Sequence, residues 1–176
     1  MASSLNCEQL NTVSEETLRE ALMRCCGSTQ WVEEMIQARP YRDWTTLVDI
    51  AEEIWYDLEE EDWLEAFSCH PKIGDTESLR QKFAQTADWC EGEQSGVEGA
   101  SEETIQSLAR LNQEYETKFG FIFIVCATGK TAEEMLQLLE ERLPNNRPTE
   151  MGIAAIEQMK ITTLRLQKWV TEEVPL

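Results

Sequence analysis

The sequence predicts an all-α fold, a single-domain bundle of about seven to nine helices. Apolar residues recur at spacings of three and four along most of the chain, and residues suited to helix N-caps precede several of these stretches. Only the run 121–127 has the length of a buried strand, and one strand cannot make a sheet. The 176 residues, 41% of them hydrophobic, suffice for one domain, which we place at 1–170 with a tail at 171–176.

The first two predicted helices are delimited by caps and breakers. Ser14 can cap a helix over 15–26, which Gly27 ends. Ser28 can open a second helix, which ends before Pro40 because the residue that precedes a proline avoids helical dihedrals.

Two further helices lead to the single histidine of the chain. A third helix is predicted over 46–58, with a broad apolar stripe and an acidic outer face, and a short fourth one around 63–67. His70 follows it. Pro71 pushes His70 out of the helical region, so the imidazole is expected at a helix end, facing a cleft.

The middle of the chain is the most loop-like part. A helix over 79–86 is expected within an otherwise polar stretch that contains several glycines. Ser101 then caps a long helix that reaches about residue 118. The apolar run 121–127 has no assignable periodicity, and we expect irregular or helical packing there.

The last two helices have clear starts. Thr131 and Glu134 form a capping box, and a turn at 144–148 precedes the final helix, 149–170. The long side chains spaced along this final helix are Ile153, Ile156, Lys160, Leu164 and Trp169.

The charge balance excludes some classes of partner. The formal net charge is −19, which repels phosphate backbones and anionic lipid headgroups, so neither nucleic acid nor membrane is an expected partner. The longest apolar run, 121–127, is too short to cross a bilayer. A small anionic substrate remains compatible with this charge, because a local arginine dominates the potential inside a pocket.

The cysteines and the single histidine argue against a metal site. Six cysteines occur without any Cys-x-x-Cys spacing, and we expect reduced thiols in an intracellular protein. One histidine is too few for a conventional zinc site, and the carboxylates lie on predicted solvent faces. No metal is predicted.

His70 is the side chain best suited to proton transfer near neutral pH, because an unperturbed imidazole titrates there. The alternative is that His70 only caps a helix end. A nucleophilic serine or cysteine is also conceivable, since Cys69 adjoins His70, but neighbours at a helix end usually point apart.

Five separated motifs carry a resemblance. In order they are Asp62–Phe67, His70–Gly74, Gly92–Ser95, Lys118–Ile124 and Lys160–Leu166. Together they resemble the OHCU decarboxylase family, which decarboxylates 2-oxo-4-hydroxy-4-carboxy-5-ureidoimidazoline (OHCU) in urate degradation. The resemblance implies an all-helical homodimer that forms (S)-allantoin and carbon dioxide without a cofactor.

The resemblance also implies roles for particular residues. His70 matches the family's catalytic acid or base, and Pro71 forms a pocket wall beside it. Glu93 matches a carboxylate that accepts hydrogen bonds from the substrate. Arg165 matches an arginine on the final helix, whose planar guanidinium suits a carboxylate.

Two further positions complete the predicted substrate-binding set. Phe121 and Ile122 wall the pocket or offer backbone groups, although most of their run is core. The sequence departs from the family at Cys90, where a serine is common, and a thiol is a poorer hydrogen-bond donor. Cys90 is therefore not among the predicted substrate-binding residues.

The resemblance further implies a peroxisomal location, with a cytosolic one as the alternative, and fusion or functional coupling to a transthyretin-like hydroxyisourate hydrolase.

The rival interpretation is a non-catalytic, acidic helical module for protein interaction, in which His70 and Pro71 only end a helix. The enzyme interpretation requires His70, Glu93 and Arg165 to line one cleft, whereas the module lets them scatter.

Overall fold

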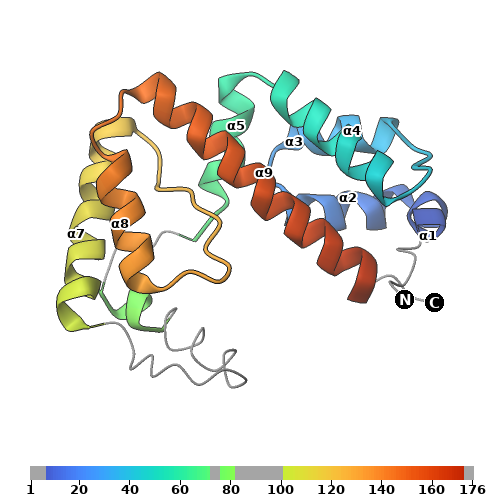
Figure 1. The fold of residues 1–176 in the computed structure, drawn as a ribbon. Helices are drawn as coiled ribbons and strands as arrows, with labels where there is room; N and C mark the ends of the chain where they lie inside the picture. Colours follow the sequence, from blue (N-terminus) through green and yellow to red (C-terminus); the bar gives the residue numbers. More distant parts are fainter. Residues whose placement is uncertain (1–6, 72–75, 82–100, 173–176) are drawn as a thin grey trace. The chain divides into compact units, whose positions relative to one another are not determined.

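The computed structural model describes residues 7–71, 76–81 and 101–172. Every regular element within these ranges is a helix, which confirms the predicted all-α class (Figure 1). Residues 76–81 form a short helix. The other helices of the described ranges are α1 (Cys7–Thr12), α2 (Glu15–Cys25), α3 (Thr29–Gln37), α4 (Trp44–Asp57), α5 (Glu60–Ser68), α7 (Glu102–Phe119), α8 (Ala132–Arg142) and α9 (Arg147–Glu172).

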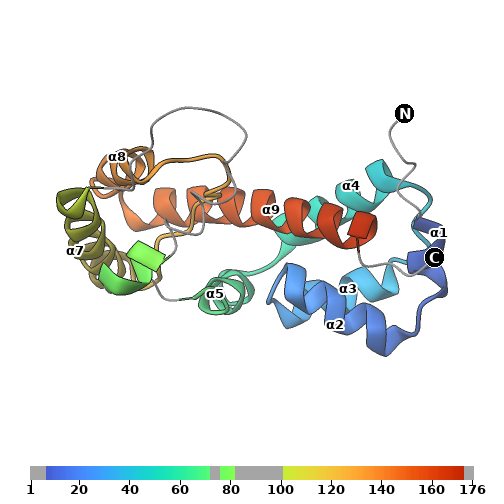
Figure 2. The ribbon, with the colours of Figure 1, turned by 90° about the horizontal axis from the view of Figure 1, so that it is seen from below.

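The chain divides into two compact units. The first unit is Met1–His70 with Ala155–Leu176, and the second is Pro71–Ala154. Helix α9 contributes residues to both. In the first unit α3 packs against α2, α4 and α5, and in the second unit α7 packs against α8 (Figure 2).

Indole hydrogen bonds tie the helices of the first unit together. The indole N–H of Trp31 donates to the Ala51 carbonyl at 3.0 Å, which joins α3 to α4. Trp55 donates to the Ala155 carbonyl at 2.9 Å, which joins α4 to α9. Trp63 donates to the Trp55 carbonyl at 2.9 Å. Trp31 and Trp55 are fully buried and stabilise the core with their large apolar area, and these bonds satisfy their single polar group.

The first helix, α1, was not predicted. Its six residues are too few to show a helical period, and it is fixed by tertiary contacts instead. Leu10 is fully buried, and the Asn11 side chain pairs with the backbone of Tyr41 in both directions, at 2.9 and 2.8 Å.

The predicted boundaries are correct to within a few residues in most helices. Helix α4 begins at Trp44, two residues before the prediction, because Asp43 rather than a later residue accepts the hydrogen bond from the Thr46 amide. Helix α2 ends one residue early, at Cys25. In the segment predicted over 79–86, residues 79–81 are helical and the rest lies outside the described residues.

Helix α9 turns a different face to the core from the one its large aliphatic residues suggest. Ile156 and Leu164 are 49% and 42% exposed. Trp169, by contrast, is buried as its place on the predicted helix suggests. The buried residues of α9 are Glu150, Met151, Ala154, Ala155, Gln158, Met159, Thr162, Leu166, Trp169 and Val170. The helix also begins two residues before the predicted start, since Asn146 accepts from the Thr149 amide at 2.9 Å.

The apolar run 121–127 contains no helix and no strand, as expected of irregular packing. It follows Gly120, which ends α7 with a left-handed φ of 80°. Phe121 and Ile124 are buried in the second unit. Over the described residues, no helix is long and apolar enough to cross a membrane.

Candidate functional site

His70 lies directly after α5, where its amide donates to the Phe67 carbonyl at 3.2 Å. Its ring is half-buried, and the ring nitrogen Nε2 lies 2.5 Å from the side-chain oxygen Oε1 of Gln158. An amide oxygen can only accept a hydrogen bond, so Nε2 carries the proton.

Gln158 is itself held in place on α9. It is 1% exposed, and its Nε2 donates to the Thr162 hydroxyl at 3.2 Å. Thr162, which is equally buried, donates to the Gln158 carbonyl at 3.0 Å. The direction of these bonds identifies which atom of the Gln158 amide is the oxygen, and that atom is the one facing His70.

The residue before His70 packs tightly against the end of α2. A Cβ atom on Gly27 would lie only 2.7 Å from the Cβ of Cys69 and closer still to its sulfur. The Cys69 thiol donates to the Gly27 carbonyl at 3.7 Å. Gly27 was predicted only as a helix stop, but its lack of a side chain is what lets the end of α5 approach.

The buried thiol beside this contact is not set up as a nucleophile. Burial raises the pKa of Cys26 to about 11, and the hydrogen bond from the Ser28 backbone and the nearby Thr162 and Arg165 offset that rise only in part. The thiol therefore stays protonated near neutral pH.

Arg165 lies on the same helix as Gln158. It is exposed, and its Nη1 atom lies 3.4 and 3.5 Å from the carbonyls of Arg24 and Cys25 at the C-terminal end of α2. The last carbonyl groups of a helix have no hydrogen-bond donor within the helix, so they favour a cation such as this guanidinium. Gln158 and Arg165 are seven residues apart, which places them on one face of α9 about 10 Å apart along its axis.

Two of the three residues expected in one cleft thus belong to the first unit, where His70 contacts α9 and Arg165 is part of it. Glu93 lies outside the described residues, as does Cys90. Pro71, which is exposed, begins the second unit. Phe121 and Ile122 also belong to that unit, where Phe121 is buried and Ile122 is half-buried.

A buried ion pair fixes the run that contains Phe121 and Ile122. Arg142 pairs through Nε with Glu150, which is fully buried, and donates from Nη1 to the Ile124 carbonyl at 2.7 Å. The Tyr115 hydroxyl donates to the same carboxylate at 2.6 Å. Burial is the larger cause that raises the pKa of Tyr115, and this hydrogen bond adds to it. The sequence analysis did not predict this ion pair. An arginine in the last turn of a helix is surrounded by the same kinds of neighbouring residues whether its side chain is buried or exposed.

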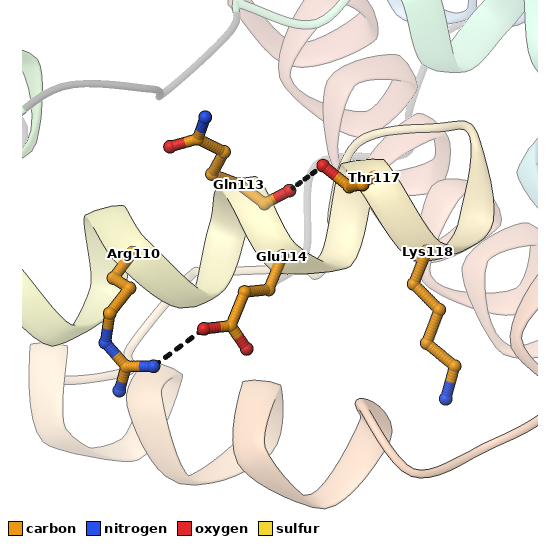
Figure 3. Close-up of a pocket in the computed structure, with 5 residues that line it drawn as sticks. All are labelled: Arg110, Gln113, Glu114, Thr117 and Lys118. Carbon is orange, nitrogen blue, oxygen red and sulfur yellow. Dashed lines mark hydrogen bonds and ion pairs between the residues drawn. The ribbon is translucent and has the colours of Figure 1, made fainter.

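A shallow hollow on the second unit is a poor candidate for a site. It is lined by residues of α7 alone: Arg110, Gln113, Glu114, Thr117 and Lys118 (Figure 3). Arg110 is paired with Glu114 at 2.7 Å, and Lys118 donates to the Leu143 carbonyl at 2.5 Å. Its charges are therefore already engaged within the protein. In the part of the chain that the structure describes, no group of three or more His, Cys, Asp or Glu residues could hold a metal ion.

Within the described residues the fold is all-α, and a buried amide on α9 contacts the imidazole of His70, the only histidine of the sequence. The family model for OHCU decarboxylase matches residues 11–167. The chain belongs to the OHCU decarboxylase family.

Relatives and a solved structure agree with this family. The chain is 40% identical over 152 residues to the uric acid degradation bifunctional protein TTL of Arabidopsis thaliana, covering 85% of this chain and 46% of that protein. It is 24% identical over 172 residues to the 2-oxo-4-hydroxy-4-carboxy-5-ureidoimidazoline decarboxylase of Haloferax volcanii, covering 96% and 98%. A crystal structure of OHCU decarboxylase in the presence of (S)-allantoin matches with a TM-score of 0.71 and 37% identity, covering 91% of this chain and all of that one. The chain spans less than half the length of the bifunctional relatives that it matches.

Proposed function

We propose that this protein decarboxylates OHCU to (S)-allantoin and carbon dioxide, with His70 as the acid or base. The observation that carries the proposal is the placement of His70 against α9, two helical turns from Arg165, in a chain of this family. The Haloferax volcanii relative, which this chain covers almost from end to end, bears the name of this activity.

The chemistry needs little beyond groups that the chain supplies. When carbon dioxide leaves the substrate, the electron pair of the broken bond moves into the adjacent imine of the ring, so the substrate provides its own electron sink. The protein has to bind the carboxylate, stabilise the developing charge and deliver a proton to one face of the planar intermediate.

Each of these tasks has a residue in the proposal. The Arg165 guanidinium binds the substrate carboxylate with paired N–H donors. His70 exchanges the proton with the substrate. Glu93 accepts hydrogen bonds from the ureido and ring N–H groups. The remaining pocket residues of the proposal are Pro71, Phe121 and Ile122.

The proposal extends to the protein's surroundings. We propose a homodimer in an intracellular, peroxisomal setting, coupled to a hydroxyisourate hydrolase that supplies OHCU. The bifunctional character of the Arabidopsis thaliana relative, named for uric acid degradation, supports this coupling.

The test is a stereochemical assay. OHCU is generated enzymatically from urate, and the purified chain is added while the rate of carbon dioxide release and the handedness of allantoin are followed. We expect a large acceleration and (S)-allantoin alone, because the uncatalysed reaction can protonate either face. A non-catalytic interaction module would leave both the rate and the racemic product of the uncatalysed reaction unchanged.

A further inference from the structure

We infer that Gln158 is a positioning residue for His70: its amide oxygen accepts a hydrogen bond from Nε2–H and so fixes the tautomer and the orientation of the imidazole. The inference deepens the proposed function and rests on it. It starts from the 2.5 Å contact between Nε2 of His70 and Oε1 of Gln158, which bridges 88 residues of sequence.

The burial of Gln158 limits the alternatives to its contact with His70. Gln158 is 1% exposed, so water does not compete readily for its oxygen. A buried amide costs free energy unless its hydrogen bonds are made, and here both ends of the amide are engaged, by His70 and by Thr162. Because the Thr162 hydroxyl donates its one proton to the Gln158 backbone carbonyl, it accepts from the amide NH2 group, which leaves the amide oxygen facing His70.

The ring therefore has one preferred tautomer and one preferred orientation. A neutral imidazole divides its proton between two nitrogens, and the partner of one nitrogen decides the state of the other. Gln158 acts through His70 and need not touch the substrate.

The sequence offers matched variants. Gln158→Leu keeps the approximate volume and removes the acceptor, whereas Gln158→Glu keeps an acceptor oxygen at the same reach. Thr162→Val leaves Gln158 in place but removes the hydroxyl that accepts from its NH2 group. This variant keeps the inference testable if Gln158→Leu does not fold. Gln167→Leu makes the same change on an exposed position of α9 and serves as the control.

Two readouts are combined. Because His70 is the only histidine of the chain, nitrogen-15 NMR of histidine-labelled protein at about pH 8, where a free imidazole is neutral, reports its tautomer without assignment. Decarboxylation kinetics give kcat and KM separately.

We expect the wild type and Gln167→Leu to show the Nε2–H tautomer. In Gln158→Leu the two tautomers should mix and kcat should fall about 10- to 100-fold with KM nearly unchanged, since small misplacements of a reacting group cost about 100-fold. Gln158→Glu should restore the tautomer and most of kcat, and Thr162→Val should show a smaller loss of both.

An unchanged tautomer in Gln158→Leu and Thr162→Val would overturn the inference, whatever their rates. So would wild-type kcat in a Gln158→Leu protein whose tautomers are mixed. A wild type that forms no (S)-allantoin above the uncatalysed rate would instead contradict the proposed function, and the tautomer measurement would still decide whether Gln158 orients the ring.

Discussion

Replacing Gly27 with alanine tests whether the close approach between α2 and α5 positions His70. The added Cβ would lie 2.7 Å from the Cβ of Cys69, whereas carbon atoms pack best at about 3.5–4.0 Å. Rotation of the Cys69 side chain moves its sulfur but not its Cβ. The backbone at the end of α5 must therefore retreat by about 1 Å.

This retreat has two measurable consequences. Overpacking of this kind costs about 1–3 kcal/mol in the free energy of unfolding, measured by urea denaturation. His70 is the next residue, and a displacement of about 1 Å lengthens its 2.5 Å contact with Gln158 beyond good hydrogen-bond geometry. We expect kcat for OHCU to fall about 100-fold.

The controls separate the clash from a general effect of alanine. Gly152 lies inside α9, and a Cβ added there would meet nothing within 4 Å, so Gly152→Ala should stabilise the protein by about 0.5–1 kcal/mol through helix propensity. The double variant Gly27→Ala, Cys69→Gly removes the clashing atoms and should recover part of the loss. A Gly27→Ala protein with wild-type stability and rate would refute this reasoning.

Three further predictions follow from the buried charges, the buried acids and the arginine of α9. Arg142→Met leaves the Glu150 carboxylate without its cation and should lower the unfolding free energy by about 3–5 kcal/mol, while replacing Glu150 by leucine as well should recover much of it, by urea denaturation. Burial raises the pKa of Cys26 to about 11 and of Tyr41 to about 12, so the unfolded chain loses these protons first and stability should fall between about pH 9 and 12; a flat profile there would contradict the assignment. Arg165→Met should raise KM for OHCU at least about 10-fold if the guanidinium binds the carboxylate, and an unchanged KM would remove Arg165 from the site.

Local features of the sequence predict most of the fold. Ser101, Thr131 and Gly120 act on their own neighbours, so the ends of α7 and the start of α8 can be located without knowing the tertiary structure. Helix α1 has no such signal because its register depends on Leu10 being buried and on Asn11 pairing with a residue 30 positions away.

The candidate site is only partly predictable, because some of its contacts join residues that are far apart in the sequence. His70 stands out as the sole histidine, and Arg165 through its motif. Gln158 does not, because its partner is 88 residues away and an amide on a helix is ordinarily solvent-exposed. One available clue was its register, since Gln158 follows Ala154 at a spacing of four and precedes Thr162 at the same spacing, along the small-residue face that α9 buries.

The most direct test of the central claim is a single-turnover measurement with His70→Asn and freshly generated OHCU, in which the handedness of the allantoin is determined. If His70 exchanges the proton, the variant should fall to the uncatalysed rate and give both enantiomers, while the wild type gives (S)-allantoin alone. A His70→Asn protein that still forms (S)-allantoin at close to the wild-type rate would contradict the account.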